Sequence, residues 1–408
     1  MVSFGSASTN FSLGNPEKLL PQEEMLEVGK KHQELSIAIL KESTSNENRI
    51  PLTPLAVDLL VNNGHSVYIE GDAGKCANFQ DRDYSEAGAQ VLFDKEELLK
   101  KDIIIKVSSL TEEEIELMPG KQIIFTVLHP HNRTQKYFRS LMQKRITAMA
   151  FEYLKDQFGN HQIVRSMSEI SGTTSVLIAA EYLSNVHNGK GEMLGGITGV
   201  TPTEVVVLGS GTAAEYAIKT AIGLGARVKV FDTDTHRLRQ LQQKIGFRLY
   251  TSILLPKVVD KALRSADVVI GAFQNINGKH SFIVTEEMVQ KMKMNSVIID
   301  IDIDRGGTFE TSKLTTHSNP VFIEHGVIHY CVPNIASRVA RTASYALSNI
   351  ITPVILDIGF CGGIKQLIKE SVGVRSSVYL FNGILTNNYV GELHDISSKD
   401  IDLLLAAF

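Results

Sequence analysis

One feature of this 408-residue chain constrains its fold most: an aliphatic run that ends in a glycine turn and continues as a helical segment. The run ends at Gly209, Gly211 follows, and Ala214 lies three residues further on. A second apolar run, residues 226–231, leads into Asp232. The glycines permit a tight turn and close approach to a pyrophosphate, the small third residue permits tight helix packing, and the acid can bind a ribose hydroxyl. The pattern predicts a nucleotide-binding Rossmann unit with phosphates at the helix N-terminus, a tight βα turn in another α/β protein being the alternative.

The composition is that of an ordinary globular chain, with 43% hydrophobic and 21% charged residues. A net charge of −4 gives no basic field for nucleic acid. Cys76, Cys331 and Cys361 lie far apart, which indicates reduced thiols rather than a disulfide framework or a metal site. There is no secretory leader pattern and no apolar run of about 18 residues. We therefore expect a cytoplasmic protein with no metal, no membrane span and no nucleic-acid partner.

Short apolar runs alternate with helical stretches along most of the chain, which predicts an α/β fold. We expect two Rossmann-like domains, each a doubly wound parallel sheet, with the second inserted into the first. Residues 1–34 are predicted to form an extension. Residues 35–165 and 341–408 are predicted to form the first, substrate-binding domain, and residues 166–340 the nucleotide-binding domain.

The predicted elements follow this division. A surface helix is expected over residues 18–35 of the extension, and a helix from residue 168 to about 184 is expected to link the domains. The other predicted helices span residues 54–63 and 342–356. Strands are expected over residues 36–40, 66–70, 103–107, 123–127 and 147–150 of the first domain, and over residues 227–231, 267–271, 296–301 and 327–330 of the second.

Several motifs resemble the superfamily of alanine dehydrogenases and proton-translocating transhydrogenases, over nearly everything from Ser36 onward. Residues 41–54, which read KESTSNENRIPLTP, resemble the family's opening motif. The resemblance implies NAD-dependent interconversion of L-alanine with pyruvate and ammonium by a homo-oligomer, usually a hexamer. Further segments carry it: residues 71–74, 165–172 and 195–200, and, separating alanine dehydrogenases from transhydrogenase subunits, residues 301–307, 329–334 and 342–349.

The resemblance also implies roles for individual residues. Arg49 matches the substrate arginine, whose guanidinium can bind a carboxylate through two parallel hydrogen bonds. His129 matches the catalytic histidine, and an imidazole suits the removal of a proton from water that attacks an imine. His131 lies two residues on and could be confused with it. Asp304 matches the second acid/base residue. The alternatives are a surface arginine, a structural strand-end histidine and an acidic strand end that binds nothing.

Asp300 and Asp302 lie close to Asp304 in sequence. Strand alternation is expected to place all three carboxylates on one face, where their repulsion would raise one pKa.

The chain departs from the family at one substrate-binding position. The family's dehydrogenases carry a second lysine two residues after the first, whereas here Lys106 is followed by Ser108. We expect both side chains to lean the same way from a strand. Serine supplies no fixed positive charge to polarise a carbonyl. Three hypotheses follow: an active alanine dehydrogenase in which Lys106 or another cation compensates, a weak dehydrogenase or one for another amino or 2-oxo acid, and a non-catalytic nucleotide-binding relative.

The expected cofactor is NAD. Asp232 can accept hydrogen bonds from the ribose hydroxyls and would repel a 2′-phosphate. Arg237 matches a basic position that contacts the adenosine part in the family, although a solvated helix face is an equal alternative for Arg237 and Arg239. The resemblance implies further cofactor neighbours: Ser168, Gly209, Gly211, Thr212, Ala213, Ala214, Asp304, Val332, Pro333 and Asn334.

Overall fold

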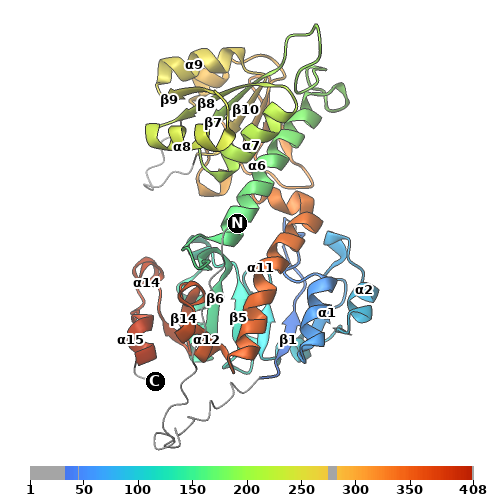
Figure 1. Cartoon of the computed structure of the whole chain (residues 1–408), viewed down its shortest axis with the longest axis vertical. Coiled ribbons are helices and arrows are strands. Elements are labelled where there is room, and N and C mark those ends of the chain that lie inside the picture. Colours follow the sequence, from blue (N-terminus) through green and yellow to red (C-terminus); the bar gives the residue numbers. More distant parts are fainter. Residues whose placement is uncertain (1–32, 45, 274–282, 407–408) are drawn as a thin grey trace, which may run out of the picture.

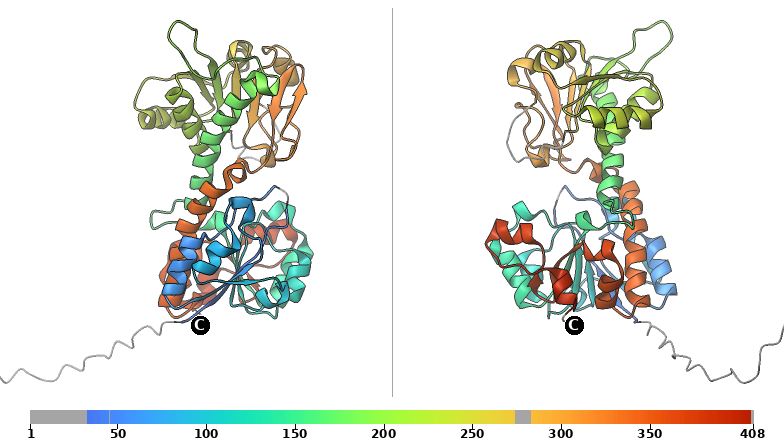
Figure 2. Two further views of the ribbon diagram at one scale, coloured as in Figure 1. Left: turned by 90° about the vertical axis from the view of Figure 1, so that its right-hand side faces the viewer. Right: turned by 60° about the vertical axis from the view of Figure 1, so that its left-hand side comes forward.

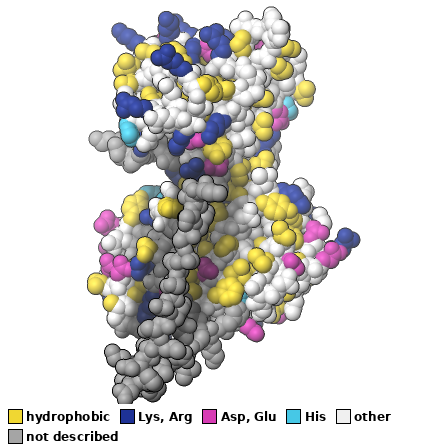
Figure 3. All heavy atoms as spheres, in the orientation of Figure 1, with side chains coloured by type: hydrophobic (Ala, Val, Ile, Leu, Met, Phe, Trp, Pro, Cys, Tyr) yellow, Lys and Arg dark blue, Asp and Glu magenta, His cyan; other side chains and the backbone are white. Residues whose placement is uncertain are grey.

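The computed structural model describes residues 33–406 apart from residue 45 and residues 274–282. These residues form two α/β bodies, one above the other along the longest axis of the molecule (Figure 1). Helix α6 (Gln162–Leu183) runs from the first body into the second, and α11 (Ala340–Phe360) leads the chain back (Figure 2). The molecule is narrower between the two bodies on the face shown in Figure 3. The helix expected over residues 18–35 lies almost wholly outside the described residues.

The first body contains an eight-stranded sheet in the order β15-β14-β6-β5-β4-β1-β2-β3. Strands β1 to β6 are parallel to their neighbours, whereas β14 runs antiparallel to β6 and to β15. The last two strands come from near the C-terminal end, so the chain returns to this sheet after building the second body. The bounds are β1 (Ser36–Ile39), β2 (Ser66–Glu70), β3 (Gln90–Leu92), β4 (Ile103–Ile105), β5 (Ile123–Thr126), β6 (Thr147–Ala150), β14 (Val378–Phe381) and β15 (Ile384–Leu385).

The second body contains a seven-stranded sheet in the order β12-β13-β11-β10-β7-β8-β9. All pairs are parallel except β12 with β13. The predicted α/β class, with two Rossmann-like units, is confirmed. The bounds are β7 (Glu204–Leu208), β8 (Arg227–Asp232), β9 (Tyr250–Ile253), β10 (Val268–Gly271), β11 (Val297–Asp300), β12 (Val321–Glu324) and β13 (Val327–Tyr330).

Helices cover both sheets. The longest after α6 and α11 is α7, which follows the glycine turn. The others have these bounds: α1 (Pro54–Asn62), α2 (Asp81–Glu86), α3 (Lys95–Leu98), α4 (Glu112–Leu117), α5 (Gln135–Gln143), α7 (Thr212–Gly223), α8 (Thr235–Ile245), α9 (Pro256–Ser265), α10 (Glu286–Val289), α12 (Ile364–Glu370), α13 (Val372–Arg375), α14 (Asn388–His394) and α15 (Ile401–Ala406).

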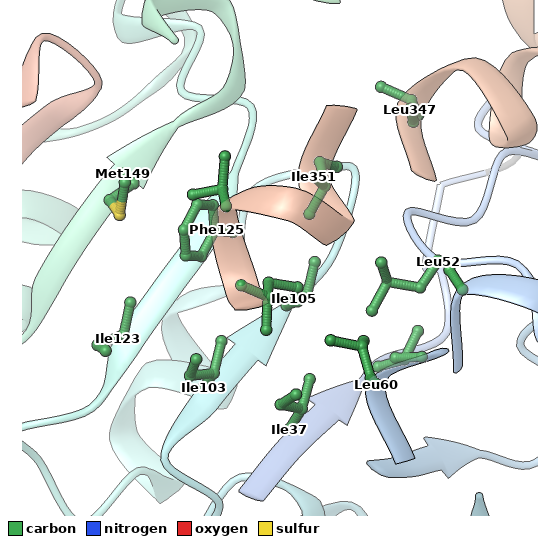
Figure 4. Close-up of a cluster of buried hydrophobic side chains, with 14 of the residues drawn as sticks. Ile37, Leu52, Leu60, Ile103, Ile105, Ile123, Phe125, Met149, Leu347 and Ile351 are labelled. Carbon is green, nitrogen blue, oxygen red and sulfur yellow. The ribbon is translucent and has the colours of Figure 1, made fainter. Parts of the chain in front are cut away.

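The core of the first body lies between its sheet and α11. Side chains of β1, β4 and β5, among them Ile37, Ile105 and Phe125, point toward Leu347 and Ile351 of α11 (Figure 4). Full burial of one such side chain contributes about 1.5–3 kcal/mol relative to exposure. Among the described residues, the stretch 335–360 alone is long and apolar enough to cross a membrane, and 56% of its most apolar window is buried. Packing on the sheet accounts for that apolar character.

The predicted strands agree with the structure to within a few residues, and two of their ends matter for the site. Strand β4 ends at Ile105 rather than residue 107, and β11 ends at Asp300 rather than residue 301. The sequence analysis did not predict β3, β9, β12, β14 or β15. These are short or edge strands, whose apolar runs are too brief to stand out.

Helices α6 and α7 approach each other closely at Gly172. A β-carbon built on Gly172 would lie 2.1 Å from the carbonyl oxygen of Ala213, in the first turn of α7. A hydrogen atom in place of a side chain is therefore required at this crossing. Because Ala213 belongs to the turn of the nucleotide motif, this contact fixes α7 against the helix that joins the two bodies.

We predict that Gly172→Ala lowers the free energy of unfolding by about 1–3 kcal/mol, the usual range for overpacking. The added methyl group must displace backbone, which cannot yield as a flexible side chain can. The matched control is Gly223→Ala in α7, where a β-carbon would meet no atom within 4 Å. This control should be neutral or stabilising by about 0.5–1 kcal/mol. Equal denaturant midpoints for the two variants would contradict the prediction.

Candidate active site

The predicted substrate residues follow adjacent strands of the first sheet. Strands β5, β4 and β1 are parallel neighbours, so the segments that follow them emerge at one edge. This edge faces the second body. The N–H of Asn48 donates to the hydroxyl of Ser337 at 2.7 Å, and the Asn334 amide donates to Glu47 at 2.8 Å. Arg49 therefore lies at the junction between the two sheets.

Arg49 is a buried cation held by a neighbouring acid. The residue is only 9% exposed, so the alternative of a surface arginine does not apply. Its Nε donates to Glu47 at 2.7 Å and a terminal nitrogen donates at 2.6 Å, while the other terminal nitrogen contacts the Met167 sulfur at 3.2 Å. Burial would lower the pKa of Arg49, but the Glu47 carboxylate raises it above its usual value. The guanidinium is therefore permanently charged.

Lys106 is sequestered beneath the sheet edge. It is fully buried, and its Nζ lies 3.0 and 3.1 Å from the two carboxylate oxygens of Glu114 and 3.3 Å from the Ser43 hydroxyl. Burial would raise the pKa of Glu114, but Lys106 holds it below its usual value. Because β4 ends at Ile105, the expected strand alternation of Lys106 and Ser108 does not apply. The charge of Lys106 is matched within the fold.

Ser108 binds a carboxylate that the sequence analysis did not single out. Its hydroxyl donates to Glu42, which also accepts from the N–H of Val107 at 2.7 Å and of Ser108 at 3.2 Å. Burial, and then the nearby Glu47, raise the pKa of Glu42 to about 7, against the lowering effects of Ser108 and Lys106. Glu42 follows β1 at the carboxyl edge, and that position was the signal available in the sequence.

His129 and His131 have different environments. The His129 side chain is exposed at the sheet edge, and its backbone is left-handed with φ 44° and ψ 67°. In contrast, Nε2 of His131 lies 2.6 Å from the hydroxyl of Tyr389. The backbone N–H of His129 donates to Glu152 at 3.2 Å, a second acid that the sequence analysis passed over. Of the two imidazoles, that of His131 already has a protein partner.

The glycine turn of the second body fits a dinucleotide. Gly209 has φ +111°, and a β-carbon there would lie 2.1 Å from the Ala272 carbonyl oxygen. Gly211 precedes α7, a β-carbon there would meet nothing within 4 Å, and no side chain caps the helix. The first N–H groups of α7 are therefore available to an anion. Ala214 is fully buried, as close packing of α7 requires.

Asp232 ends β8 beside this turn and is 2% exposed. One carboxylate oxygen accepts from the Ser210 hydroxyl at 2.6 Å, and the other accepts from the N–H of Asp234 at 3.0 Å. These bonds orient the carboxylate next to the glycine turn. Because β7 and β8 are parallel neighbours, the acid and the phosphate-binding turn share one sheet edge.

The three aspartates at and beyond the end of β11 do not alternate along a strand, so that expectation was wrong. The strand ends at Asp300, Asp302 lies in a turn, and the exposed Asp304 is in a short 3-10 helix, Ile303–Arg305. Burial raises the pKa of Asp300, although it accepts from the N–H of Thr308 at 2.9 Å. Burial also raises the pKa of Asp302 to about 7, with Asp304 and Asp300 adding to the effect. Repulsion between the carboxylates therefore contributes to the raised pKa of Asp302, but burial contributes more.

The remaining predicted cofactor residues have varied positions. The Ser168 hydroxyl donates to the Val164 carbonyl within α6 at 2.8 Å. Thr212 and Ala213 begin α7, Val332 is buried after β13, and Pro333 is half-buried beside it. Asn334, which has a left-handed backbone, reaches Glu47 as described above.

Arg237 lies on the exposed face of α8, with its Nε 3.9 Å from an Asp234 carboxylate oxygen. Lysine and arginine side chains gather over this part of the second body (Figure 3). The structure thus places Arg237 on a solvated face, at the end of the sheet where Asp232 lies.

Two sheets that face each other at their carboxyl edges, one with a nucleotide turn and the other with a buried arginine and an exposed histidine, define a two-domain nucleotide-binding protein of the dehydrogenase type. The chain belongs to the alanine dehydrogenase/PNT family. The family model described as "Alanine dehydrogenase/PNT, N-terminal domain" matches residues 38–171. The model described as "Alanine dehydrogenase/PNT, C-terminal domain" matches residues 175–388.

The chain is also similar to individual members of this family over nearly their whole length. The chain is 36% identical to alanine dehydrogenase 2 of Staphylococcus aureus over 369 residues, which is 90% of this chain and 99% of the relative. It is 38% identical to alanine dehydrogenase of Methanococcus maripaludis over 362 residues, or 88% and 96% of the two chains.

Solved structures show the same fold. An L-alanine dehydrogenase structure matches with a TM-score of 0.81 at 33% identity, covering 88% of this chain and 99% of that one. A transhydrogenase from Sinorhizobium meliloti matches with a TM-score of 0.73 at 23% identity, over 87% and 99% of the chains, which shows a common fold.

We predict that Glu42 makes stability fall as the pH rises. Its pKa is about 7 in the folded protein and about 4.5 when exposed, so between these values the folded state binds more protons than the unfolded state. The free energy of unfolding should therefore decrease through that window, by about 1–3 kcal/mol between pH 5 and pH 8. Denaturant titrations should show a smaller loss in Glu42→Gln than in the wild type, and the loss that remains comes from Asp300 and Asp302, whose pKa values burial also raises. Glu113→Gln on the exposed face of α4 is the control, and parallel curves for wild type and Glu42→Gln would rule the effect out.

Proposed function

We propose that this protein is an NAD-dependent alanine dehydrogenase, which interconverts L-alanine with pyruvate and ammonium. One observation carries the proposal: a chain 36–38% identical to proteins named alanine dehydrogenase places a buried arginine and an exposed histidine at the sheet edge that faces a nucleotide turn. The proposal includes a division of labour, with the substrate on the first sheet and the cofactor on the second. It also includes a cytoplasmic location and a homo-oligomer, a hexamer as the family resemblance implies.

Arg49 binds the substrate carboxylate in this proposal. Glu47 occupies its Nε and one terminal nitrogen, while the other terminal nitrogen has the weakly accepting Met167 sulfur as its partner. That nitrogen is the one best able to exchange its partner for a carboxylate oxygen. Glu47 keeps the guanidinium in place, so the cation is oriented before the substrate arrives.

His129 is the proposed general base and Asp304 the second acid/base residue. Both are exposed, and each follows a strand at the carboxyl edge of its sheet. His129 takes a proton from the water that attacks the substrate carbon and returns it in the reverse direction. NAD, when bound, supplies a nicotinamide ring that exchanges a hydride with that carbon. Asp304 follows a strand of the sheet that would hold the nucleotide, and in this proposal it contacts both the nicotinamide and the substrate.

The nucleotide would be held by the glycine turn and its neighbours. The first N–H groups of α7, beside Gly209 and Gly211, would hold the phosphates, and Asp232 would accept from the ribose hydroxyls. A 2′-phosphate would bring negative charge to a buried carboxylate, which favours NAD over NADP. The proposed neighbours also include Ser168, Thr212, Ala213, Ala214, Arg237, Val332, Pro333 and Asn334.

The serine at position 108 supports a second candidate function, that of a dehydrogenase for another 2-oxo acid. With Lys106 matched by Glu114 and Ser108 bound to Glu42, Arg49 is the cation that this proposal assigns to the substrate. A site with fewer cations would bind and polarise a small 2-oxo acid less strongly. The extent of the similarity to alanine dehydrogenases favours alanine as the substrate.

The direct test is oxidation of NADH by the purified protein with pyruvate and ammonium, run beside Ser108→Lys and with NADPH as the alternative cofactor. We expect turnover by the unmodified protein, with NADH preferred at least tenfold. Turnover by Ser108→Lys alone would instead indicate a different natural substrate. No turnover by either protein with any of a panel of 2-oxo acids would overturn the proposed function.

We predict that His129→Ala lowers kcat by about 10²- to 10⁴-fold, the usual contribution of a general base. The NADH affinity should stay within about threefold, because His129 lies on the other sheet. The matched control is His131→Ala, two residues away, which removes the contact with Tyr389 and should keep kcat within about threefold. Similar losses in the two variants would show that His129 has no special role.

A further inference from the structure

Strands β5 and β6 end side by side, which brings Glu152 to the backbone of His129. In their parallel register Thr126 lies opposite Ala150, so residues 127–129 pass next to residues 151–153. Glu152 lies in the 3-10 turn that follows β6. One of its oxygens, Oε1, accepts from the N–H of Leu128 at 2.9 Å and from the N–H of His129 at 3.2 Å.

The backbone that Glu152 holds is a strained one. His129 has φ 44° and ψ 67°, in the left-handed region that residues with a β-carbon rarely adopt. Such a conformation persists only where the surrounding structure enforces it. Downstream, the N–H of Asn132 donates to the His129 carbonyl at 2.9 Å, and Nε2 of His394 lies 2.9 Å from the carbonyl oxygen of Pro130. These contacts fix the following turn, while Glu152 fixes the entry to it.

Glu152 is itself held in place. Its backbone carbonyl oxygen lies 2.8 Å from Nδ1 of His161, which directly precedes α6. Its second carboxylate oxygen, Oε2, is buried and has no hydrogen-bond partner among the described residues. The side chain is therefore not a solvated surface acid. Burial of this one oxygen carries a desolvation cost that the two backbone contacts of Oε1 help to offset.

We propose that Glu152 is a positioning residue for His129: its carboxylate holds the 128–129 backbone so that the imidazole is presented at the sheet edge. The inference rests on the proposed function, in which His129 transfers the proton. Glu152 acts only through His129 and touches neither substrate nor cofactor. Loss of the acceptor lets the segment relax from its left-handed conformation, and the imidazole then leaves the reacting position.

The test compares three variants of the full-length protein. Glu152→Gln keeps an oxygen that can accept from both N–H groups, whereas Glu152→Ala and the similarly sized Glu152→Met remove the acceptor. We expect Glu152→Ala and Glu152→Met to lower kcat ten- to a hundredfold, with KM for pyruvate and the NADH affinity changed less than threefold. Glu152→Gln should retain kcat within about threefold. In the His129→Ala background, loss of the acceptor should cost less than about twofold, because both changes remove the same function.

Hydrogen exchange of the peptide covering residues 124–133 provides a readout that does not depend on activity. Exchange should be faster in Glu152→Met than in wild type and unchanged in Glu152→Gln. Equal exchange in all three proteins, or an equal loss of kcat with and without His129, would overturn the proposal. If the unmodified protein turns over no amino or 2-oxo acid, the proposed function fails, but the exchange measurement still decides whether Glu152 holds this segment.

Discussion

The junction between the two bodies depends on the carboxylate of Glu47. One of its oxygens accepts from Nε and the backbone N–H of Arg49, and the other accepts from a terminal nitrogen of Arg49 and from the amide of Asn334. One side chain therefore orients the buried cation and ties the first sheet edge to the second body. Breaking a buried ion pair by removal of one partner typically costs about 3–5 kcal/mol, because the other charge stays buried alone. Any ligand that draws on Arg49 must do so without disrupting this pair.

Most of the fold could be predicted because its signals are local. The glycine turn before α7, the buried strand before it and Asp232 after the next strand all fall within one βαβ unit, whose geometry is nearly invariant. The strands β12, β14 and β15 could not be predicted in this way. Strand β14 pairs antiparallel with β6, which is distant in sequence, as between Leu380 and Ala148. Strands β12 and β15 are short edge strands that pair only with their sequence neighbours β13 and β14.

The site was predictable only as far as it follows from sheet edges and family motifs. The expectation for Asp302 and Asp304 was wrong because strand periodicity was extended past the point where β11 ends, and beyond Asp300 the chain turns. Glu42 and Glu152 were missed for a different reason. Each acts by accepting backbone N–H groups from a neighbouring strand end, and neither partner shows in a linear pattern. Such contacts need the sheet order as well as the sequence.

Two buried cations at the first sheet edge each have an acid as partner, whereas Glu42, which binds Ser108, lies outside this pairing. Arg49 is matched by Glu47 and Lys106 by Glu114, whereas Glu42 has a hydroxyl and two backbone N–H groups but no cation of its own. A buried carboxylate without a counter-ion favours its protonated form, which accounts for a pKa of about 7. A lysine at position 108 would supply the missing charge, whereas Ser108 supplies only a hydroxyl. If Arg49 binds a carboxylate as proposed, the added negative charge favours the protonated form of Glu42 further. Binding of a 2-oxo acid would then be linked to proton uptake near neutral pH.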